Sequence, residues 1–251
     1  MIEVSGLTKR YRDLTAIEDL SFQVSKGEVL GFLGPNGSGK STTMRILTGY
    51  QPATSGTAKV AGFDVFQQPL EVKRRVGYLP EIPPLYPDMT VRAYLRFVAE
   101  LKGIGRKERD AEVDRVAAAT HLESVMHRLI ANVSKGFKQR VGIAQALLGS
   151  PDVLILDEPT VGLDPSQILE VRDLIRSFRG KHTVILSTHI MQEVAATCDS
   201  VLVIARGKLR ARDTLAGLQE KHPGKSLEEI FLQLTSDVAQ AEAPADASQA
   251  A

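Results

Sequence analysis

Cysteine and charge of one sign are both scarce in this chain, and each scarcity excludes a class of protein. The 251 residues include one cysteine, Cys198, which excludes an intrachain disulfide and a zinc site built from several thiolates. The formal net charge is +1, whereas dedicated nucleic-acid binders usually carry a basic excess. We therefore expect no nucleic acid among its partners, and the composition suits a reducing cytosol.

Long apolar runs are also missing. No run approaches the roughly 20 residues that span a bilayer, and the first residues lack the basic and then apolar segments of a secretory signal. We expect a soluble protein, or one that reaches a membrane through a partner. What the chain does have is 43% apolar and 24% charged residues, enough for a sizeable core in one large α/β domain or a core with a smaller lobe.

The hydrophobic pattern predicts an α/β protein with two kinds of strand. Residues 2–24 alternate apolar and polar positions, which predicts antiparallel strands at the edge of the domain. Four continuous apolar runs predict strands buried on both faces; they are residues 29–33, 153–156, 183–187 and 201–204. Another strand is expected at 56–62.

Helices are expected mainly in the middle of the chain. Amphipathic segments at 91–102 and 107–119 belong to a helical insertion from about residue 89 to residue 150. Further helices are expected at 165–178, where a proline occupies the first turn, and at 226–234, which opens with a capping box. Residues 236–251 hold no aromatic anchor, so we expect a disordered tail after a domain of residues 1–235.

A glycine-rich loop between a strand and a helix is the most specific motif. Residues 34–41 read Gly-Pro-Asn-Gly-Ser-Gly-Lys-Ser and fit the P-loop pattern of nucleoside triphosphate binding. Backbone N–H groups and a helix N-terminus suit phosphate oxygens. Lys40 would reach the outer phosphates, and is expected to face solvent without nucleotide. The residues expected to hold the nucleotide are Gly34, Pro35, Asn36, Gly37, Ser38, Gly39, Lys40, Ser41 and Thr42.

An acidic pair ends the second buried run. Asp157 and Glu158 follow four apolar residues, which disfavours an ordinary surface pair. Carboxylates at a strand end beside a phosphate loop suit magnesium binding and catalysis. Asp157 would hold Mg²⁺ together with the Ser41 hydroxyl, and Glu158 would polarise the attacking water. A kinase or GTPase also offers an acidic strand end, so this motif leaves the class of enzyme open.

Three further motifs narrow the class. Residues 132–140 read Asn-Val-Ser-Lys-Gly-Phe-Lys-Gln-Arg, residues 161–165 read Val-Gly-Leu-Asp-Pro, and residues 187–189 read Ser-Thr-His. With the P-loop and the acidic pair, this order resembles the nucleotide-binding domain of ABC ATPases from about residue 2 to residue 234. The resemblance implies a P-loop NTPase core with a mixed, mainly parallel sheet, an N-terminal antiparallel β subdomain and an inserted helical subdomain.

The resemblance also implies roles for single residues. Tyr11 would stack on adenine, although packing of an edge strand is the alternative. His189 would contact the γ-phosphate and act in catalysis with Glu158 and Lys40. Ser134 and Gly136 match the signature loop, which in this family meets the nucleotide of a second subunit.

Two positions depart from the family's usual residues. Lys135 lies in the signature loop, where it brings a charge toward the partner's phosphates. Glu81 stands where the family usually holds a glutamine, and either side chain offers an oxygen to Mg²⁺. Both departures resemble a branch of single-domain ATPases that serve multidrug, polysaccharide, copper-maturation or gliding-motility exporters.

The resemblance therefore implies the ATP- and Mg²⁺-dependent ATPase subunit of a membrane exporter. It would form a homodimer or heterodimer through its ATP sites, and a transmembrane permease subunit would hold it at the inner face of the cell membrane through residues 83–89. Two alternatives remain. A soluble ABC ATPase acting on ribosomes or DNA often carries two nucleotide domains or a long coiled coil, and neither is seen here. A P-loop kinase or GTPase lacks the signature loop, and no guanine-reading Asn-Lys-x-Asp motif is present.

Overall fold

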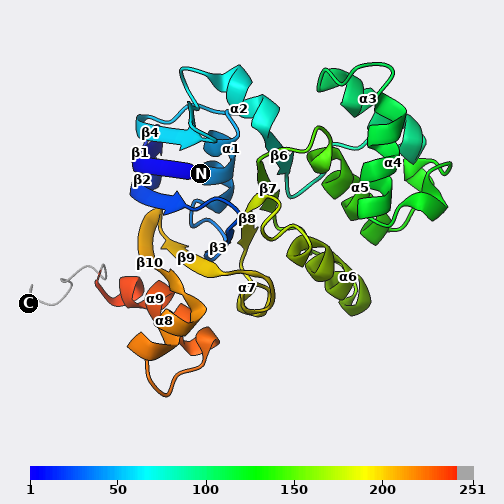
Figure 1. Cartoon of the computed structure of the whole chain (residues 1–251). Helices are drawn as coiled ribbons and strands as arrows, with labels where there is room; N and C mark the ends of the chain where they lie inside the picture. Colours follow the sequence, from blue (N-terminus) through cyan, green and yellow to red (C-terminus); the bar gives the residue numbers. More distant parts are fainter. Residues whose placement is uncertain (242–251) are drawn as a thin grey trace, which may run out of the picture.

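A four-stranded antiparallel sheet lies against a six-stranded, mainly parallel sheet, with helices around both (Figure 1). The computed structural model describes residues 1–241 of the chain, with side chains to residue 236. The predicted fold class is confirmed: a P-loop NTPase core, an N-terminal antiparallel subdomain and an inserted helical subdomain.

The antiparallel sheet has the strand order β2-β1-β4-β5. Its strands are β1 (Ile2–Tyr11), β2 (Leu14–Val24), β4 (Ser55–Val60) and β5 (Phe63–Asp64). Apolar side chains alternate along β1 and β2, so that one face of the sheet is buried against the core. This confirms the antiparallel strands predicted for residues 2–24.

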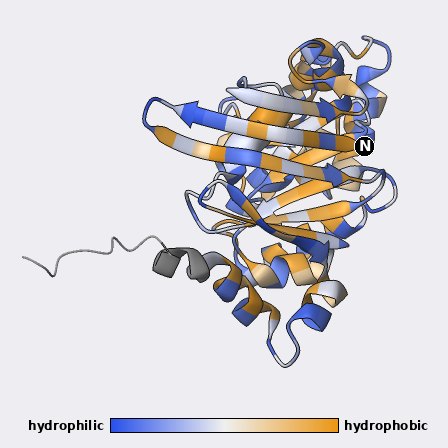
Figure 2. Ribbon diagram, turned by 90° about the vertical axis from the view of Figure 1, so that its left-hand side faces the viewer, coloured by the Kyte–Doolittle hydropathy of each residue, from blue (hydrophilic) through white to orange (hydrophobic). Residues whose placement is uncertain are grey.

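The larger sheet has the order β10-β9-β3-β8-β7-β6. The strands are β3 (Val29–Leu33), β6 (Val76–Leu79), β7 (Val153–Asp157), β8 (Thr183–Thr188), β9 (Ser200–Ala205) and β10 (Lys208–Thr214). All neighbours pair in parallel except β10 with β9. Every residue of β3, β7, β8 and β9 is buried, as the four apolar runs predicted, and Figure 2 shows the apolar colour concentrated on these strands.

Helices cover both faces and form the insertion. The insertion holds α3 (Val91–Leu101), α4 (Arg109–Ala119) and α5 (Lys135–Leu147), with short 3-10 turns at Glu123–Val125 and Ile130–Asn132. It lies on the side of the molecule away from the antiparallel sheet (Figure 1). The other helices are α1 (Lys40–Leu47), α2 (Pro69–Arg75), α6 (Pro165–Arg176), α7 (Met191–Thr197), α8 (Leu215–Lys221) and α9 (Leu227–Ala241).

The last helix is longer than predicted. Its capping box is confirmed, because Ser226 N–H donates to Glu229 Oε2 (2.7 Å) and Glu229 N–H donates to Ser226 Oγ (3.2 Å). The helix then continues to Ala241, so the expected disordered tail is wrong for residues 236–241. Alanine and glutamine favour helix and can extend it without an apolar anchor. Residues 242–251 lie outside the described part of the chain, and the domain limit at residue 235 stays a prediction.

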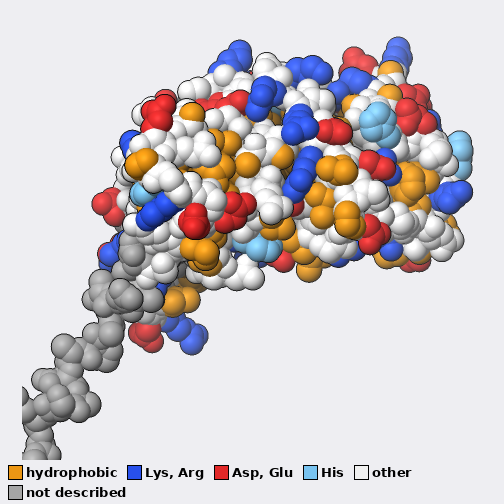
Figure 3. Space-filling view, turned by 90° about the horizontal axis from the view of Figure 1, so that it is seen from below, with side chains coloured by type: hydrophobic (Ala, Val, Ile, Leu, Met, Phe, Trp, Pro, Cys, Tyr) orange, Lys and Arg blue, Asp and Glu red, His pale blue; other side chains and the backbone are white. Residues whose placement is uncertain are grey.

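Basic and acidic side chains are interspersed on the face of the molecule seen from below (Figure 3). No large patch of positive or of negative charge is seen among the described residues on that face. Within residues 1–241, no helix is both long enough and apolar enough to cross a bilayer. Both observations agree with the charge balance and the short apolar runs of the sequence.

Burial of the single thiol gives a direct test of the core. Cys198 is 6% exposed at the end of α7, and desolvation raises its pKa to about 12. The thiolate is the reactive form, so iodoacetamide at pH 8 should label the native protein slower than the unfolded protein by a factor on the order of 10³. Mass spectrometry of labelled samples, with Cys198→Ala as the blank, measures this. Equal labelling rates in buffer and in guanidinium chloride would contradict the burial of Cys198.

Candidate functional site

Three loops meet at the carboxyl ends of adjacent parallel strands. In the sheet register Leu33 lies beside Thr188, and Asp157 lies beside Ser187. The P-loop therefore leaves β3 next to the point where β7 delivers Asp157 and Glu158 and where β8 delivers His189. Ligands of open α/β sheets bind at this edge, so the topology gathers the predicted motifs where a nucleotide would lie.

The P-loop conformation depends on its glycines. Gly37 and Gly39 have φ values of 77° and 106°, which side chains other than glycine rarely adopt. A Cβ at Gly39 would also lie 2.6 Å from the carbonyl oxygen of Ala16. No side chain caps α1 at Gly39. The first N–H groups of this helix therefore lack intrahelical partners and suit phosphate oxygens.

Lys40 does not face solvent, so that expectation is wrong. The side chain is 6% exposed, and its Nζ donates to the carbonyl oxygens of Gly34 (2.7 Å) and Pro35 (3.3 Å). Nζ also lies 3.4 Å from Glu158 Oε1. An ammonium this deeply buried needs such partners, and phosphate oxygens would replace them when nucleotide binds.

Glu158 lies between a lysine and a histidine. Its side chain is 8% exposed, and the two carboxylate oxygens lie 3.1 and 3.0 Å from His189 Nδ1. The backbone of Glu158 has φ +49°, while its N–H donates to the carbonyl of Ser187 (2.9 Å). Strained backbone of this kind is concentrated at functional sites. Of the three residues expected to act in catalysis, Lys40 and His189 thus each contact the third, Glu158.

Asp157 has the environment of a metal ligand. It is 2% exposed, and among the described residues its Oδ1 has no hydrogen-bond partner. Buried polar atoms are nearly always paired, and a buried carboxylate oxygen is suited to a cation. Burial, with the Asp157 charge adding to it, raises the pKa of Tyr78 on β6 to about 12.

The other two expected metal ligands lie nearby but do not form a closed cage. Ser41 and Glu81 line the cavity above the P-loop, and Glu81 is exposed. No group of three or more His, Cys, Asp and Glu side chains within residues 1–241 could hold a metal by itself. Mg²⁺ commonly takes one or two protein oxygens and completes its shell with phosphate and water, so Asp157 and Ser41 fit that ion.

A cavity of about 730 Å³ joins these residues. It contains most of the expected nucleotide ligands, whereas Gly34, Pro35 and Ser38 of the P-loop do not line it, and neither does the expected metal ligand Asp157 at the end of β7. The expected residues that line it are Tyr11, Asn36, Gly37, Gly39, Lys40, Ser41, Thr42, Glu81, Glu158 and His189. Tyr11 is 42% exposed, and its hydroxyl donates to Gln51 Oε1 (2.8 Å), so its ring is available at the cavity wall.

Sequence reasoning missed part of the cavity wall. Residues 14–16, Val161, Arg206 and Gly207 also line it. The Arg-Gly pair has φ values of 49° and 74°, which place it in the tight turn between β9 and β10. Gly207 N–H donates to the Ser38 carbonyl (2.9 Å), which fixes the turn against the P-loop. The pair predicts a turn, but no local signal places that turn beside the nucleotide cavity.

The signature loop lies apart from this cavity. Ser134 caps α5 by accepting from Phe137 N–H (3.3 Å), and neither Ser134 nor Gly136 lines the cavity. A Cβ at Gly136 would lie 2.6 Å from Gln167 Oε1, so glycine permits the close approach of α5 and α6. Lys135 Nζ lies against Gly162 in the loop that precedes α6. Within one chain, the structure therefore does not bring the signature residues to the P-loop.

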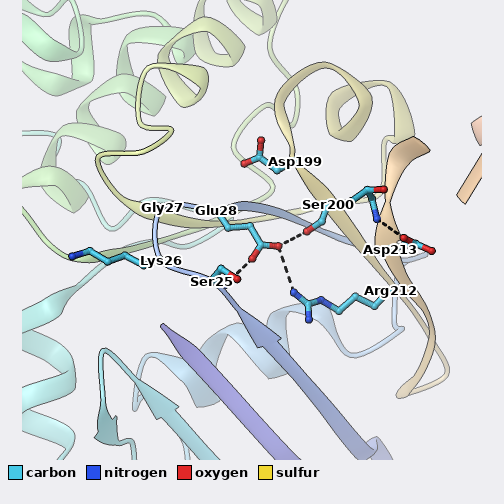
Figure 4. Close-up of a pocket in the computed structure, with 9 residues that line it drawn as sticks. Ser25, Lys26, Gly27, Glu28, Asp199, Ser200, Arg212 and Asp213 are labelled. Atoms are coloured by element: carbon cyan, nitrogen blue, oxygen red, sulfur yellow. Dashed lines mark hydrogen bonds and ion pairs between the residues drawn. The ribbon is translucent and has the colours of Figure 1, made fainter. Parts of the chain in front are cut away.

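A second cavity, of about 670 Å³, lies at the opposite end of β3 (Figure 4). Its central group is Glu28, which accepts from Ser200 Oγ and from Ser25 N–H and lies 3.4 Å from Arg212. Burial raises the pKa of Glu28, but these hydrogen bonds and the arginine outweigh it and lower the pKa overall. Glu28 pairs with Arg212 inside this cavity, whereas Asp199 and Asp213 pair with Arg179 and Lys221 outside its lining, and none of the predicted motifs reaches it.

Comparison with known proteins agrees with this geometry. The family model described as ABC transporter matches residues 17–161. The ATP-binding protein NatA of Bacillus subtilis is 37% identical over 238 residues, covering 92% of this chain and 97% of NatA. The bacitracin transport ATP-binding protein BcrA of Bacillus licheniformis is 40% identical over 211 residues, covering 83% of this chain and 68% of BcrA.

Solved structures support the same assignment. An ATP-binding subunit of an ABC transporter matches with a TM-score of 0.83 and 32% identity, covering 93% of this chain and 99% of that chain. A dimeric ATP-binding cassette with ADP and Pi shares the fold at a TM-score of 0.78 and 22% identity, covering 86% of this chain and 99% of that chain. With the P-loop, Glu158 and His189 around one cavity, these matches show that the chain belongs to the ABC transporter family as an ATP-binding and ATP-hydrolysing subunit.

Proposed function

We propose that this transporter ATPase drives export through a separate transmembrane subunit, at the inner face of the cell membrane. The observation that carries the proposal is the contact of Glu158 with both Lys40 and His189 inside the P-loop cavity. The names of two relatives support a role in transport. BcrA is named for bacitracin transport, and YbhF of Escherichia coli, 36% identical over 243 residues, is named a probable multidrug ATP-binding protein.

The site residues divide the work of hydrolysis. Lys40 exchanges its contacts with the Gly34 and Pro35 carbonyls for phosphate oxygens, which leaves the Glu158 carboxylate free to orient a water and accept its proton. His189 holds Glu158 from the other side and contacts the γ-phosphate. Mg²⁺, when bound, supplies positive charge that offsets the charge of the phosphates, and Asp157, Ser41 and Glu81 are the residues that would hold it.

A head-to-tail dimer would complete each site. Ser134 and Gly136 lie away from their own cavity at the start of α5, where Ser134 and Lys135 are exposed and Gly136 is buried. A helix N-terminus suits an anion, so the signature loop of one subunit can meet the γ-phosphate held by the P-loop of another. The second subunit is either a copy of this chain or a related chain.

The permease would dock between the core and the insertion. A cavity of about 330 Å³ lies there, lined by residues of the loop that follows β6, by Ile130 and by the start of α5. Ile82 is 83% exposed at this place. Tyr86 packs edge-on against Tyr94 and Phe97 with ring centroids 6.0 and 5.7 Å apart, which fixes the loop on α3. Exposed apolar groups on an anchored loop are typical of a docking surface.

Replacing the proposed base should separate nucleotide binding from hydrolysis. Glu158→Gln keeps the shape but is a poor proton acceptor, so we expect ATP turnover to fall by ~10²–10⁴-fold while ATP still binds. Trapped ATP should then drive dimerisation, measured by size-exclusion chromatography with ATP and with ADP as the control. A variant that hydrolyses at the wild-type rate would exclude Glu158 as the base. One that binds ATP yet stays monomeric would contradict the dimer.

The docking surface can be tested by recovery of the partner. Tagged chain purified from detergent-solubilised membranes of its own host should carry one polytopic membrane protein, identified by mass spectrometry. Ile82→Asp should lose it, because a charge would be buried in the interface. Leu70→Asp, at another exposed apolar residue (68%) that lies on α2, is the matched control. Recovery of ribosomes or DNA in place of a membrane protein would favour the soluble alternative.

Glu81 should tune the dependence on magnesium. Its carboxylate shares the cavity with Glu158, so Glu81→Gln should relax a like-charge repulsion that exists without metal and make turnover less dependent on Mg²⁺, with the ratio of rates at saturating and limiting Mg²⁺ falling by roughly two- to tenfold. Glu81→Ala should lose the oxygen ligand and reduce the maximal rate. Titration of Mg²⁺ against ATPase rate measures both, with Glu123→Gln as the control for loss of an exposed charge. Identical curves for all four proteins would mean that Glu81 takes no part in the site.

A further inference from the structure

A buried carboxylate outside the predicted motifs connects the two loops of the active site. Glu193 lies in the first turn of α7, the helix that begins directly after the His189 loop, and is 1% exposed. Both of its carboxylate oxygens accept hydrogen bonds from threonine hydroxyls. A charged group this deep in a protein is costly unless it is well paired, so its position requires those two donors.

One of the two donors lies in the segment that holds Glu158, and the other lies in the segment that holds His189. Thr160 follows Glu158 in the turn after β7, and its Oγ1 donates to Glu193 Oε1. Thr188 is the last residue of β8 and directly precedes His189, and its Oγ1 donates to Glu193 Oε2 (2.8 Å). The same Thr188 oxygen accepts a hydrogen bond from the N–H of Ile190 (3.1 Å). The residues on either side of His189 are therefore bonded to each other.

These hydroxyls are themselves out of solvent. Thr160 is 3% exposed and Thr188 is fully buried. Neither hydroxyl can exchange its carboxylate partner for water without local opening, so the bridge is a fixed part of the loops. The turn that holds Glu158 and the strand end that holds His189 are thus fastened to one side chain.

We propose that Glu193 is a positioning residue for hydrolysis, which holds Glu158 and His189 in register through Thr160 and Thr188. The proposal rests on the roles given above to Glu158 and His189. It assigns Glu193 no contact with ATP. A displacement of about 1 Å at a reacting group can cost on the order of 10²-fold in rate, so loss of either hydroxyl should act on turnover more than on nucleotide binding.

The alternative is a purely structural carboxylate that only secures α7. Thr197 separates the two cases, because it lies on the same helix, is fully buried, and donates to the backbone carbonyl of Glu193 (2.5 Å) rather than to its carboxylate. Thr197→Val therefore removes a buried hydroxyl from α7 and leaves the bridge between the loops intact.

The experiment compares isosteric variants in the full chain. We expect Thr160→Val and Thr188→Val to lower kcat for ATP by about 10- to 100-fold with the KM for ATP changed by less than about threefold. Thr160→Ser and Thr188→Ser, which keep the hydroxyl, should recover most of the lost kcat. Thr197→Val should keep kcat within about threefold of the wild-type value. Thermal midpoints of all five variants show how much of each effect is loss of stability.

Two outcomes would overturn the proposal. If Thr160→Val, Thr188→Val and Thr197→Val lower the thermal midpoint alike and all keep kcat near the wild-type value, Glu193 only secures α7. If serine fails to restore turnover, the hydroxyls are not the cause of the loss. Glu158→Gln, measured alongside, tests the assigned base independently, because a fully active Glu158→Gln would remove the proposed mechanism whatever the threonine variants do.

Discussion

The contact between Lys40 and Glu158 is the constraint on which the rest of the site depends. Both side chains are under a tenth exposed, and their charged atoms lie 3.4 Å apart. Removing one partner of a buried ion pair typically costs about 3–5 kcal/mol, because the remaining charge is left without compensation. Each charge here has a second set of partners, the P-loop carbonyls for Lys40 and His189 for Glu158. Phosphate can therefore take over Lys40 while Glu158 keeps a partner.

That arrangement requires three strands to end at the same edge. Lys40 follows β3, Glu158 follows β7 and His189 follows β8, and the register of the parallel sheet brings these strand ends side by side. The backbone of Glu158 is left-handed (φ +49°), a conformation that costs on the order of 1–3 kcal/mol in a residue other than glycine. The hydrogen bond from its N–H to the Ser187 carbonyl and the bond from Thr160 to Glu193 hold the turn in that conformation.

The sequence predicted what is decided locally. Runs of mainly apolar residues identified β3, β7, β8 and β9 because both faces of these strands are buried. The P-loop was found because its glycines and lysine have fixed offsets. Strand β10, in contrast, is polar and exposed at the edge of the sheet, so no pattern marked it. Lys40 was expected in solvent because a lysine usually is. Its burial depends on carbonyls and a carboxylate that only the folded chain brings together. The same holds for the bond between Glu193 and Thr160, which lie 33 residues apart in the sequence.

The position of the signature loop shows how the insertion is connected to the site. Lys135 lies against Gly162, a Cβ at Gly136 would meet Gln167, and Arg140 lies 3.4 Å from Glu170. These contacts join α5 to the loop before α6 and then to α6 itself. That loop begins directly after Thr160, which is bonded to Glu193. A force on the insertion from a docked partner would therefore act first on the segment between Thr160 and α6, which begins at the hydrogen bond from Thr160 to Glu193.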